Sequence, residues 1–151
     1  PGVDAPTLIR PDAFLQRDLG RPVTDEDKAA YKARTLESFR YALEKGVKIA
    51  VGSDTVYEPA CEYGQQSLDE YKELIDRGMT VLQGIQAATE NAACACAMQH
   101  RVGAIKEGLE ADYLVLDENP AESAEVLNNH ESIKQVVLNG KTVVENGLLM
   151  W

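Results

Sequence analysis

The short apolar run at residues 47–51 is the feature that most constrains how this chain folds. Gly46 ends a helical pattern before it, only Lys48 interrupts the run, and Gly52 stops it. A run this short suits a strand buried on both faces, as in a parallel sheet that helices cover. Asp54 follows two residues later, at the place where barrel enzymes put catalytic groups. The same acid could equally cap a loop, and this segment alone leaves both interpretations open.

The segments before this run predict half of a strand–helix–strand unit. Thr24 followed by three acids is typical of a helix start, and Gly46 of a helix end, so we expect a helix near 25–45. Residues 5–9 are a candidate strand before this helix, with a proline that places it at a sheet edge or a strand start. We expect the rest of residues 1–22 to form a loop.

Two further helices are predicted after Asp54. Ser67 and Glu70 have the spacing of a capping box, and the helix that they open would end at Gly78. Thr80 and Gln83 have the same capping-box spacing, which predicts the start of another helix at Thr80. One face of that helix would carry three apolar side chains, Ile85, Ala88 and Ala92.

The pattern changes to β from Gly103 onward. Residues 113–117 form a short apolar strand in this interpretation. An Asn-Gly pair joins two candidate strands at 133–138 and 141–144, which is the strongest hairpin signature in the chain. A second Asn-Gly turn follows at 146–147.

Composition excludes several classes of function. A chain of 151 residues can form a real core, and its net charge of −10 disfavours nucleic acid and anionic membranes as partners. No apolar run approaches the length that spans a bilayer, and no signal peptide opens the chain. Because the first residue is Pro1, we expect either processing or a longer parent polypeptide. The three cysteines do not suggest a disulfide framework, which favours the cytoplasm.

Few residues outside Asp54 suggest chemistry. Cys94 and Cys96 would point in different directions on a helix, so we expect buried small side chains and not metal ligands. His100 and His130 have no metal-ligand spacing, and we expect both at the surface. The chain has no Gly-rich phosphate loop and no G-x-S-x-G motif. From the residues alone, one well-placed carboxylate is the candidate site.

Several segments, taken in order, resemble the metal-dependent amidohydrolases, and most of all the branch of imidazolonepropionase-like and Xaa-Pro-dipeptidase-like enzymes. Gly52-Ser53-Asp54 resembles the G-T-D that ends the last barrel strand of that family. The other matching segments cover much of the rest of the chain: 46–50, 78–80, 88–93, 103–108, 111–117, 119–120 and 137–141.

This resemblance implies an α/β fold that is the last part of a TIM-type (β/α)8 barrel, followed by strands of a small β-sandwich domain. Residues 5–9 would be the seventh barrel strand and residues 47–51 the eighth. The barrel part would span residues 1–102, and the small β-domain residues 103–151.

The resemblance also implies hydrolysis of an amide or other C–N bond by a water molecule that a divalent metal, zinc by preference, activates. Asp54 would ligate the metal and act as the general base. The loop after it carries Tyr57 and Tyr63, which we expect to contact a small-molecule or dipeptide-like substrate. Many relatives have His-Gly in this loop where this chain has Tyr63-Gly64, so the substrate can differ from theirs.

The other metal ligands of the family, an H-x-H pair, a bridging lysine and two further histidines, would precede Pro1. We therefore expect the isolated chain to hold no stoichiometric metal and to have no hydrolase activity. Two barrel strands alone would leave sheet edges unpaired, so the rest of a barrel or a homo-oligomer would cover them. The alternative is a truncated, non-catalytic remnant that serves as a binding or oligomerisation module.

Overall fold

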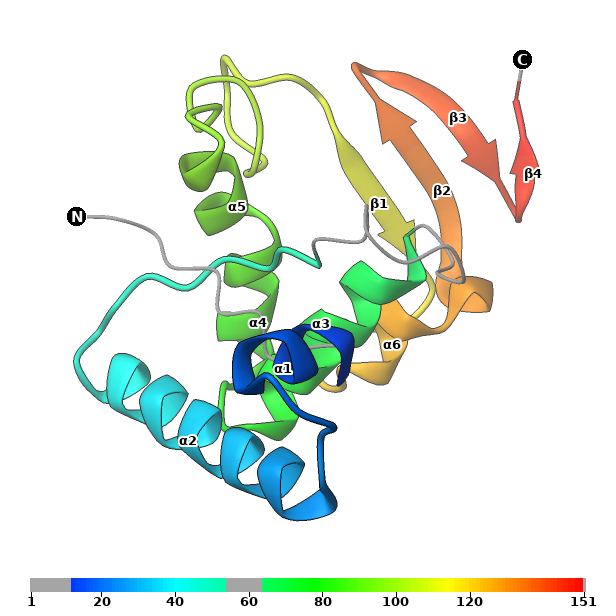
Figure 1. The fold of residues 1–151 in the computed structure, drawn as a ribbon. Helices are drawn as coiled ribbons and strands as arrows, with labels where there is room; N and C mark the ends of the chain where they lie inside the picture. Colours follow the sequence, from blue (N-terminus) through cyan, green and yellow to red (C-terminus); the bar gives the residue numbers. More distant parts are fainter. Residues whose placement is uncertain (1–11, 54–63, 151) are drawn as a thin grey trace.

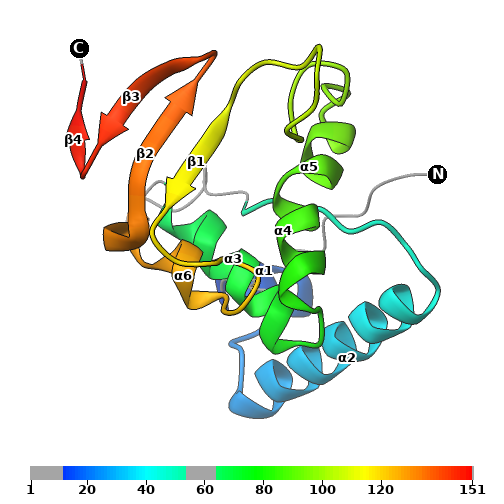
Figure 2. The same cartoon turned by 180° about the vertical axis from the view of Figure 1, so that it is seen from behind.

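The computed structural model describes residues 12–53 and 64–150 and combines helices with one antiparallel sheet (Figure 1). The helix α2 lies at the end of the molecule away from the sheet, with α3 and α4 between them, and the reverse view agrees (Figure 2). The helices before the sheet are α1 (Asp12–Leu19), α2 (Asp25–Glu44), α3 (Gln65–Asp76), α4 (Val81–Ala88) and α5 (Glu90–Ala95). The remaining elements are β1 (Tyr113–Leu116), α6 (Glu125–Asn128), the 3-10 turn His130–Ser132, β2 (Ile133–Leu138), β3 (Lys141–Glu145) and β4 (Leu148–Leu149).

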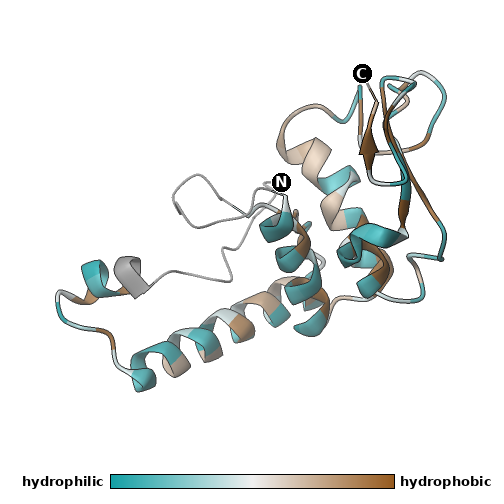
Figure 3. Ribbon diagram, turned by 90° about the vertical axis from the view of Figure 1, so that its right-hand side faces the viewer, coloured by the Kyte–Doolittle hydropathy of each residue, from teal (hydrophilic) through white to brown (hydrophobic). Residues whose placement is uncertain are grey.

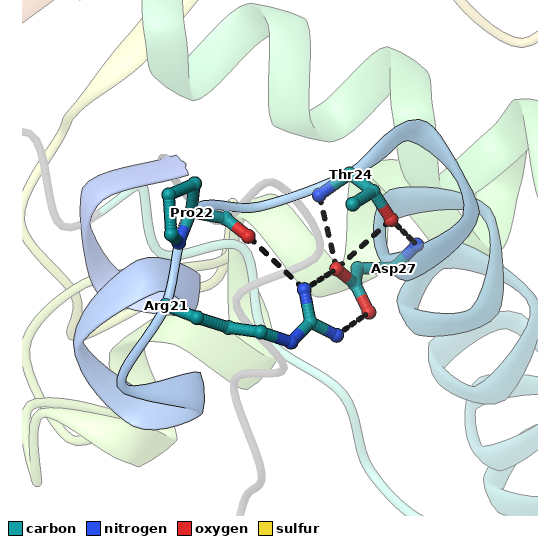
Figure 4. A network of polar contacts seen from close by, with 4 residues as sticks. All are labelled: Arg21, Pro22, Thr24 and Asp27. Atoms are coloured by element: carbon teal, nitrogen blue, oxygen red, sulfur yellow. Dashed lines mark hydrogen bonds and ion pairs between the residues drawn. The ribbon is translucent and has the colours of Figure 1, made fainter.

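The start of α2 confirms the predicted cap at Thr24. Thr24 Oγ1 accepts a hydrogen bond from the Asp27 backbone N–H at 3.2 Å, and the Asp27 carboxylate accepts one from the Thr24 N–H at 2.9 Å. Arg21 donates to both oxygens of the same carboxylate at 2.6 and 2.7 Å (Figure 4). The hydrogen bonds from Arg21 hold the pKa of Asp27 well below its usual range.

The helices α2 and α3 also end where the sequence predicted. After α2, the Gly46 N–H bonds to the Leu43 carbonyl and the Val47 N–H to the Ala42 carbonyl. Gly46 has a φ of 68°, so this is a Schellman end with glycine in the left-handed region. The same pair of bonds closes α3 around Gly78.

Two helix predictions were wrong. The stretch expected to be a loop up to residue 22 contains α1, whose Leu15 is buried. The second helix begins at Gln65, with Gly64 as N-cap and no side-chain cap, so Ser67 and Glu70 do not form a capping box. Glu70 is only 7% exposed, so its side chain faces the interior and does not return to the backbone as a capping box requires.

The third predicted helix is two helices in the structure. The cap at Thr80 is confirmed, with Gln83 as its partner, but α4 ends at Ala88. Thr89 has φ −121° and ψ −86°, so the chain changes direction before α5 begins. The predicted apolar face is displaced, because Gly84 and Ala87 are buried and Ala88 is exposed.

The apolar run at 47–51 lies in the core, as predicted, but it is not a strand. Ile49 is 2% exposed and packs with Phe39, Leu74, Met79 and Ala87 from the surrounding helices and turns. Among the described residues Ile49 forms a single bridge, and the flanking residues have no regular secondary structure. A strand needs a ladder of bonds to a neighbouring strand. In the part of the chain that the structure describes, this run makes hydrogen bonds to α2, α4 and α5.

The C-terminal sheet confirms the predicted strands and both turns. Its order is β1-β2-β3-β4, with every neighbouring pair antiparallel. Asn139 and Gly140 have φ values of 49° and 75°, and Asn146 and Gly147 have 46° and 78°. Left-handed values at both central positions identify type I′ turns, which Asn-Gly favours.

The sheet is a single layer within residues 12–53 and 64–150, so the second layer of a sandwich is not observed there. Hydrophobic residues line its strands (Figure 3). In the register of the sheet, Leu114, Val136, Val144 and Leu149 form one row across the four strands, and the outer two are 45% and 64% exposed. One apolar stripe therefore remains largely uncovered by the described chain.

Candidate functional site

Residues 49–53 lead directly to Asp54, and three hydrogen bonds hold them against the helices. The side-chain amide of Asn91 donates from Nδ2 to the Ile49 carbonyl at 2.8 Å. The Val51 N–H donates to the carbonyl of Ala87 at 3.0 Å. Ser53 Oγ lies 3.1 Å from Ser67 Oγ, so α3 holds the end of the segment. The segment is thus fixed by side chains and helix ends.

The start of α5 presents Asn91 to the Ile49 carbonyl. The change of direction at Thr89 separates α4 from α5, and Thr89 Oγ1 donates back to the Ile85 carbonyl at 2.7 Å. Hydroxyls that bond to the carbonyl four residues earlier often accompany a bend in a helix. Asn91, the second residue of α5, is half-buried beside the segment.

Gly103 packs closely against the start of α5. A Cβ on Gly103 would lie 2.6 Å from the Ala93 Cβ and 3.1 Å from the Thr89 carbonyl oxygen. The φ of Gly103 is 98°, a backbone conformation that residues other than glycine rarely adopt. The chain after α5 therefore packs back onto the first turn of α5.

Glu70 is a buried acid that the sequence interpretation placed at a helix cap. Tyr71 and Leu74, one and four residues further along α3, and the C-cap residue Arg77 are also buried. An acid inside the buried stripe of an amphipathic helix is the signal that could have identified it. Burial raises the pKa of Glu70 to about 7.

Stability should therefore depend on the ionisation of Glu70. The unfolded carboxyl has an ordinary pKa near 4.5, so between about pH 4.5 and 7 the folded state holds a proton that the unfolded state has lost. By linkage, stability falls as the pH rises through this interval and the cost is complete above pH 7. At 1.36 kcal/mol per unit, this cost is on the order of 3 kcal/mol.

We expect Glu70→Gln to remove this pH dependence. The variant should match the parent near pH 4 and should unfold at a higher temperature at pH 8, measured by circular dichroism at both values. Glu37→Gln, an exposed change of equal charge on α2, is the control and should leave the difference in place. Equal pH dependence in both variants would show that Glu70 ionises normally.

The predicted site residues Asp54, Tyr57 and Tyr63 lie outside the described residues, and so does the candidate strand at 5–9. His100 and His130 are exposed, as predicted. Cys94 is half-buried, but Cys96 is exposed, so the expectation that both are buried was wrong.

Within residues 12–53 and 64–150, no three His, Cys, Asp or Glu side chains come together as a metal site. The described side chains therefore do not fit a metal ion by themselves. In the same part of the chain, every helix is too short or too polar to cross a membrane.

The described chain contains a segment packed against helices, which leads in sequence to Asp54, then the helices α3, α4 and α5, and then a small antiparallel sheet. Comparison with known proteins assigns this arrangement to a class. The model of the amidohydrolase family matches residues 23–143. The chain belongs to the amidohydrolase family.

Two kinds of relative illustrate the similarity. Ochratoxinase of Aspergillus niger is 34% identical over 118 residues, which are 77% of this chain and 23% of that protein. Its crystal structure matches with a TM-score of 0.71 and 30% identity over 91% of this chain and 31% of the other. A Xaa-Pro dipeptidase with bound methionine matches with a TM-score of 0.68 and 27% identity, over 93% of this chain and 34% of the other. The chain thus spans about a quarter to a third of these relatives.

Proposed function

We propose that this chain is the C-terminal portion of a metal-dependent hydrolase of amide or other C–N bonds. The family match over residues 23–143 supports this reaction class, and coverage of about a third of the similar solved chains supports a partial barrel. The observation that carries the proposal is the segment 49–53, which is buried at Ile49 and Ala50, is held at three points and continues into Asp54.

Asp54 is the general base and one metal ligand in this proposal. Its carboxylate takes a proton from the attacking water, whose oxygen bonds to the carbonyl carbon of the substrate. When the C–N bond breaks, the same carboxylic acid returns the proton to the leaving nitrogen. The products are an acid and an amine, and Asp54 is regenerated.

A divalent metal, zinc by preference, would make water acidic enough to react near neutral pH. Asp54 alone falls short of the three or four protein ligands that zinc needs. The described residues bring no three candidate ligands together, so the remaining ligands of the proposed site would lie outside the described residues.

The same proposal gives the chain two parts. Residues 1–102 would complete a TIM-type barrel as its strands 7 and 8 with their helices. Residues 103–151 would belong to a small β-sandwich domain. The exposed stripe that ends in Leu114 and Leu149 supports a further layer over this sheet.

A small-molecule or dipeptide-like substrate is the proposed ligand, with Tyr57 and Tyr63 among its contacts. The similarity to a Xaa-Pro dipeptidase and to ochratoxinase supports small substrates of this kind. The net charge of −10 gives no support to a nucleic-acid partner.

Metal removal tests the proposal. The full polypeptide that carries this sequence should hydrolyse members of a panel of dipeptides and N-acyl amino acids. Dialysis against a chelator should abolish turnover, and added zinc should restore it. The isolated 151-residue chain should be inactive and should hold no stoichiometric metal by elemental analysis. Undiminished turnover after complete metal removal would refute the metal-dependent reaction.

A non-catalytic module is the second candidate, and the exposed Leu148 and Leu149 on β4 favour it. Self-association through the edge strand β4 would make the isolated chain a homo-oligomer. Light scattering measures the oligomeric state of the isolated chain. A dimer that Leu149→Lys dissociates would support the module if the full polypeptide is also inert toward the panel.

A further inference from the structure

We propose that Asn91 is a positioning residue for the reaction, through its hold on the backbone of residues 49–53. This inference rests on the proposed function, because it concerns the direction in which the chain enters Asp54. Asn91 touches no reacting atom in this proposal.

The first support is the bond that Asn91 makes. Ile49 and Ala50 are 2% and 3% exposed, so the Ile49 carbonyl lies in the interior. A buried carbonyl needs a hydrogen-bond donor, and Asn91 Nδ2 supplies one at 2.8 Å. The bond joins residues 42 positions apart in the sequence, so it fixes the segment relative to α5.

The second support is that Asn91 is itself held firmly. The break at Thr89 sets where α5 starts, and Gly103 packs against the Thr89 carbonyl and Ala93. Ala93 is 6% exposed, two residues along from Asn91. A donor on such a rigid base can set the position of a backbone to a few tenths of an ångström.

The third support is a second hydrogen bond, two residues further along the same segment. The Val51 N–H bonds to the Ala87 carbonyl at the end of α4. The two bonds hold the same segment on opposite sides of the Thr89 break, so its register depends on both. Without the Asn91 donor, the Ile49 carbonyl loses its hydrogen bond to α5, and the segment keeps only its bonds to Ala87 and Ser67 among those described, so its position relative to α5 is less constrained. A shift of about 1 Å at a catalytic group costs on the order of 100-fold in rate.

The test compares Asn91→Leu with Gln86→Leu in the full polypeptide. Leucine has nearly the shape of asparagine but cannot donate. Gln86 is an exposed residue of α4, and its Nε2 bonds to Glu90 at 3.1 Å, so its loss removes an amide hydrogen bond away from the segment. We expect Asn91→Leu to lower kcat by roughly 10- to 100-fold with KM changed less than about twofold. Gln86→Leu should change neither.

Hydrogen exchange gives a readout that does not depend on turnover. Peptides covering residues 47–53 should exchange at least about tenfold faster in Asn91→Leu than in Gln86→Leu, while α3 exchanges equally in both. A merely structural role would lower the unfolding temperature and leave the kcat of the folded enzyme unchanged.

The outcomes separate this inference from the proposed function. If the parent protein hydrolyses the panel and Asn91→Leu keeps its kcat, Asn91 is not a positioning residue and the proposed function stands. Unchanged exchange at residues 47–53 also overturns the inference. If the parent protein with metal shows no turnover, the proposed function fails, and this inference fails with it.

Discussion

Gly103→Ala should cause a large loss of stability. The new methyl group would lie 2.6 Å from the Ala93 Cβ and 3.1 Å from the Thr89 carbonyl oxygen, and neither atom is the end of a flexible side chain. Overpacking of this kind costs roughly 1–3 kcal/mol, and a strained backbone at φ 98° costs about 1–3 kcal/mol more. Thermal unfolding should therefore begin on the order of 10 °C lower.

Gly108→Ala is the matched control for this prediction. Gly108 has a φ of 87°, close to that of Gly103, but a Cβ there would meet no atom within 4 Å. The two variants share the backbone cost, so the difference between their unfolding temperatures measures the packing of Gly103 against α5. Equal losses in both variants would mean that α5 moves away at little cost.

The contrast between Thr80 and Ser67 explains which helix starts could be predicted. Thr80 and Gln83 are exposed, and their bonds join residues three apart, so the local pattern decides the cap. Ser67 and Glu70 have the same spacing, but the burial of Glu70 among other parts of the fold decides its role. A pattern of four residues contains no information about that burial.

The hairpins and the segment 49–53 also differ in whether local sequence determines their structure. Asn-Gly determines a type I′ turn from two residues, and both turns formed as predicted. The burial of the run at 47–51 was also predictable from its apolar residues. Its hold on the helices was not, because the bonds from Asn91 and to Ala87 join positions far apart in sequence. The break at Thr89, which sets the position of Asn91, had no signal in the helical periodicity.

The candidate site was predictable only as far as one acid. Asp54 was found from its place after a buried run and from the family pattern, and it remains a proposal together with Tyr57 and Tyr63. Glu70 was missed as a buried group because charged residues are expected outside unless they are paired. Its raised pKa follows from the packing of α3, which no short motif encodes.

Asp54→Asn should abolish catalysis in the full polypeptide while leaving the fold intact. Asparagine has the shape of aspartate but cannot accept the proton of the attacking water, and general bases contribute about 10²–10⁴-fold to rate. We expect kcat to fall by roughly 1,000-fold and metal content to fall as well, since one ligand loses its charge. Steady-state kinetics and elemental analysis measure the two effects.

The control for Asp54→Asn is Asp25→Asn, an exposed change of equal charge in the first turn of α2. It should keep kcat, KM and metal content, because helix-dipole effects at one exposed acid affect stability only by a fraction of a kcal/mol. A non-catalytic module predicts that Asp54→Asn resembles this control in every measurement. Retained turnover in Asp54→Asn would assign the base to another residue, whereas lost turnover with full metal content would keep Asp54 as the base and remove it from the ligand set.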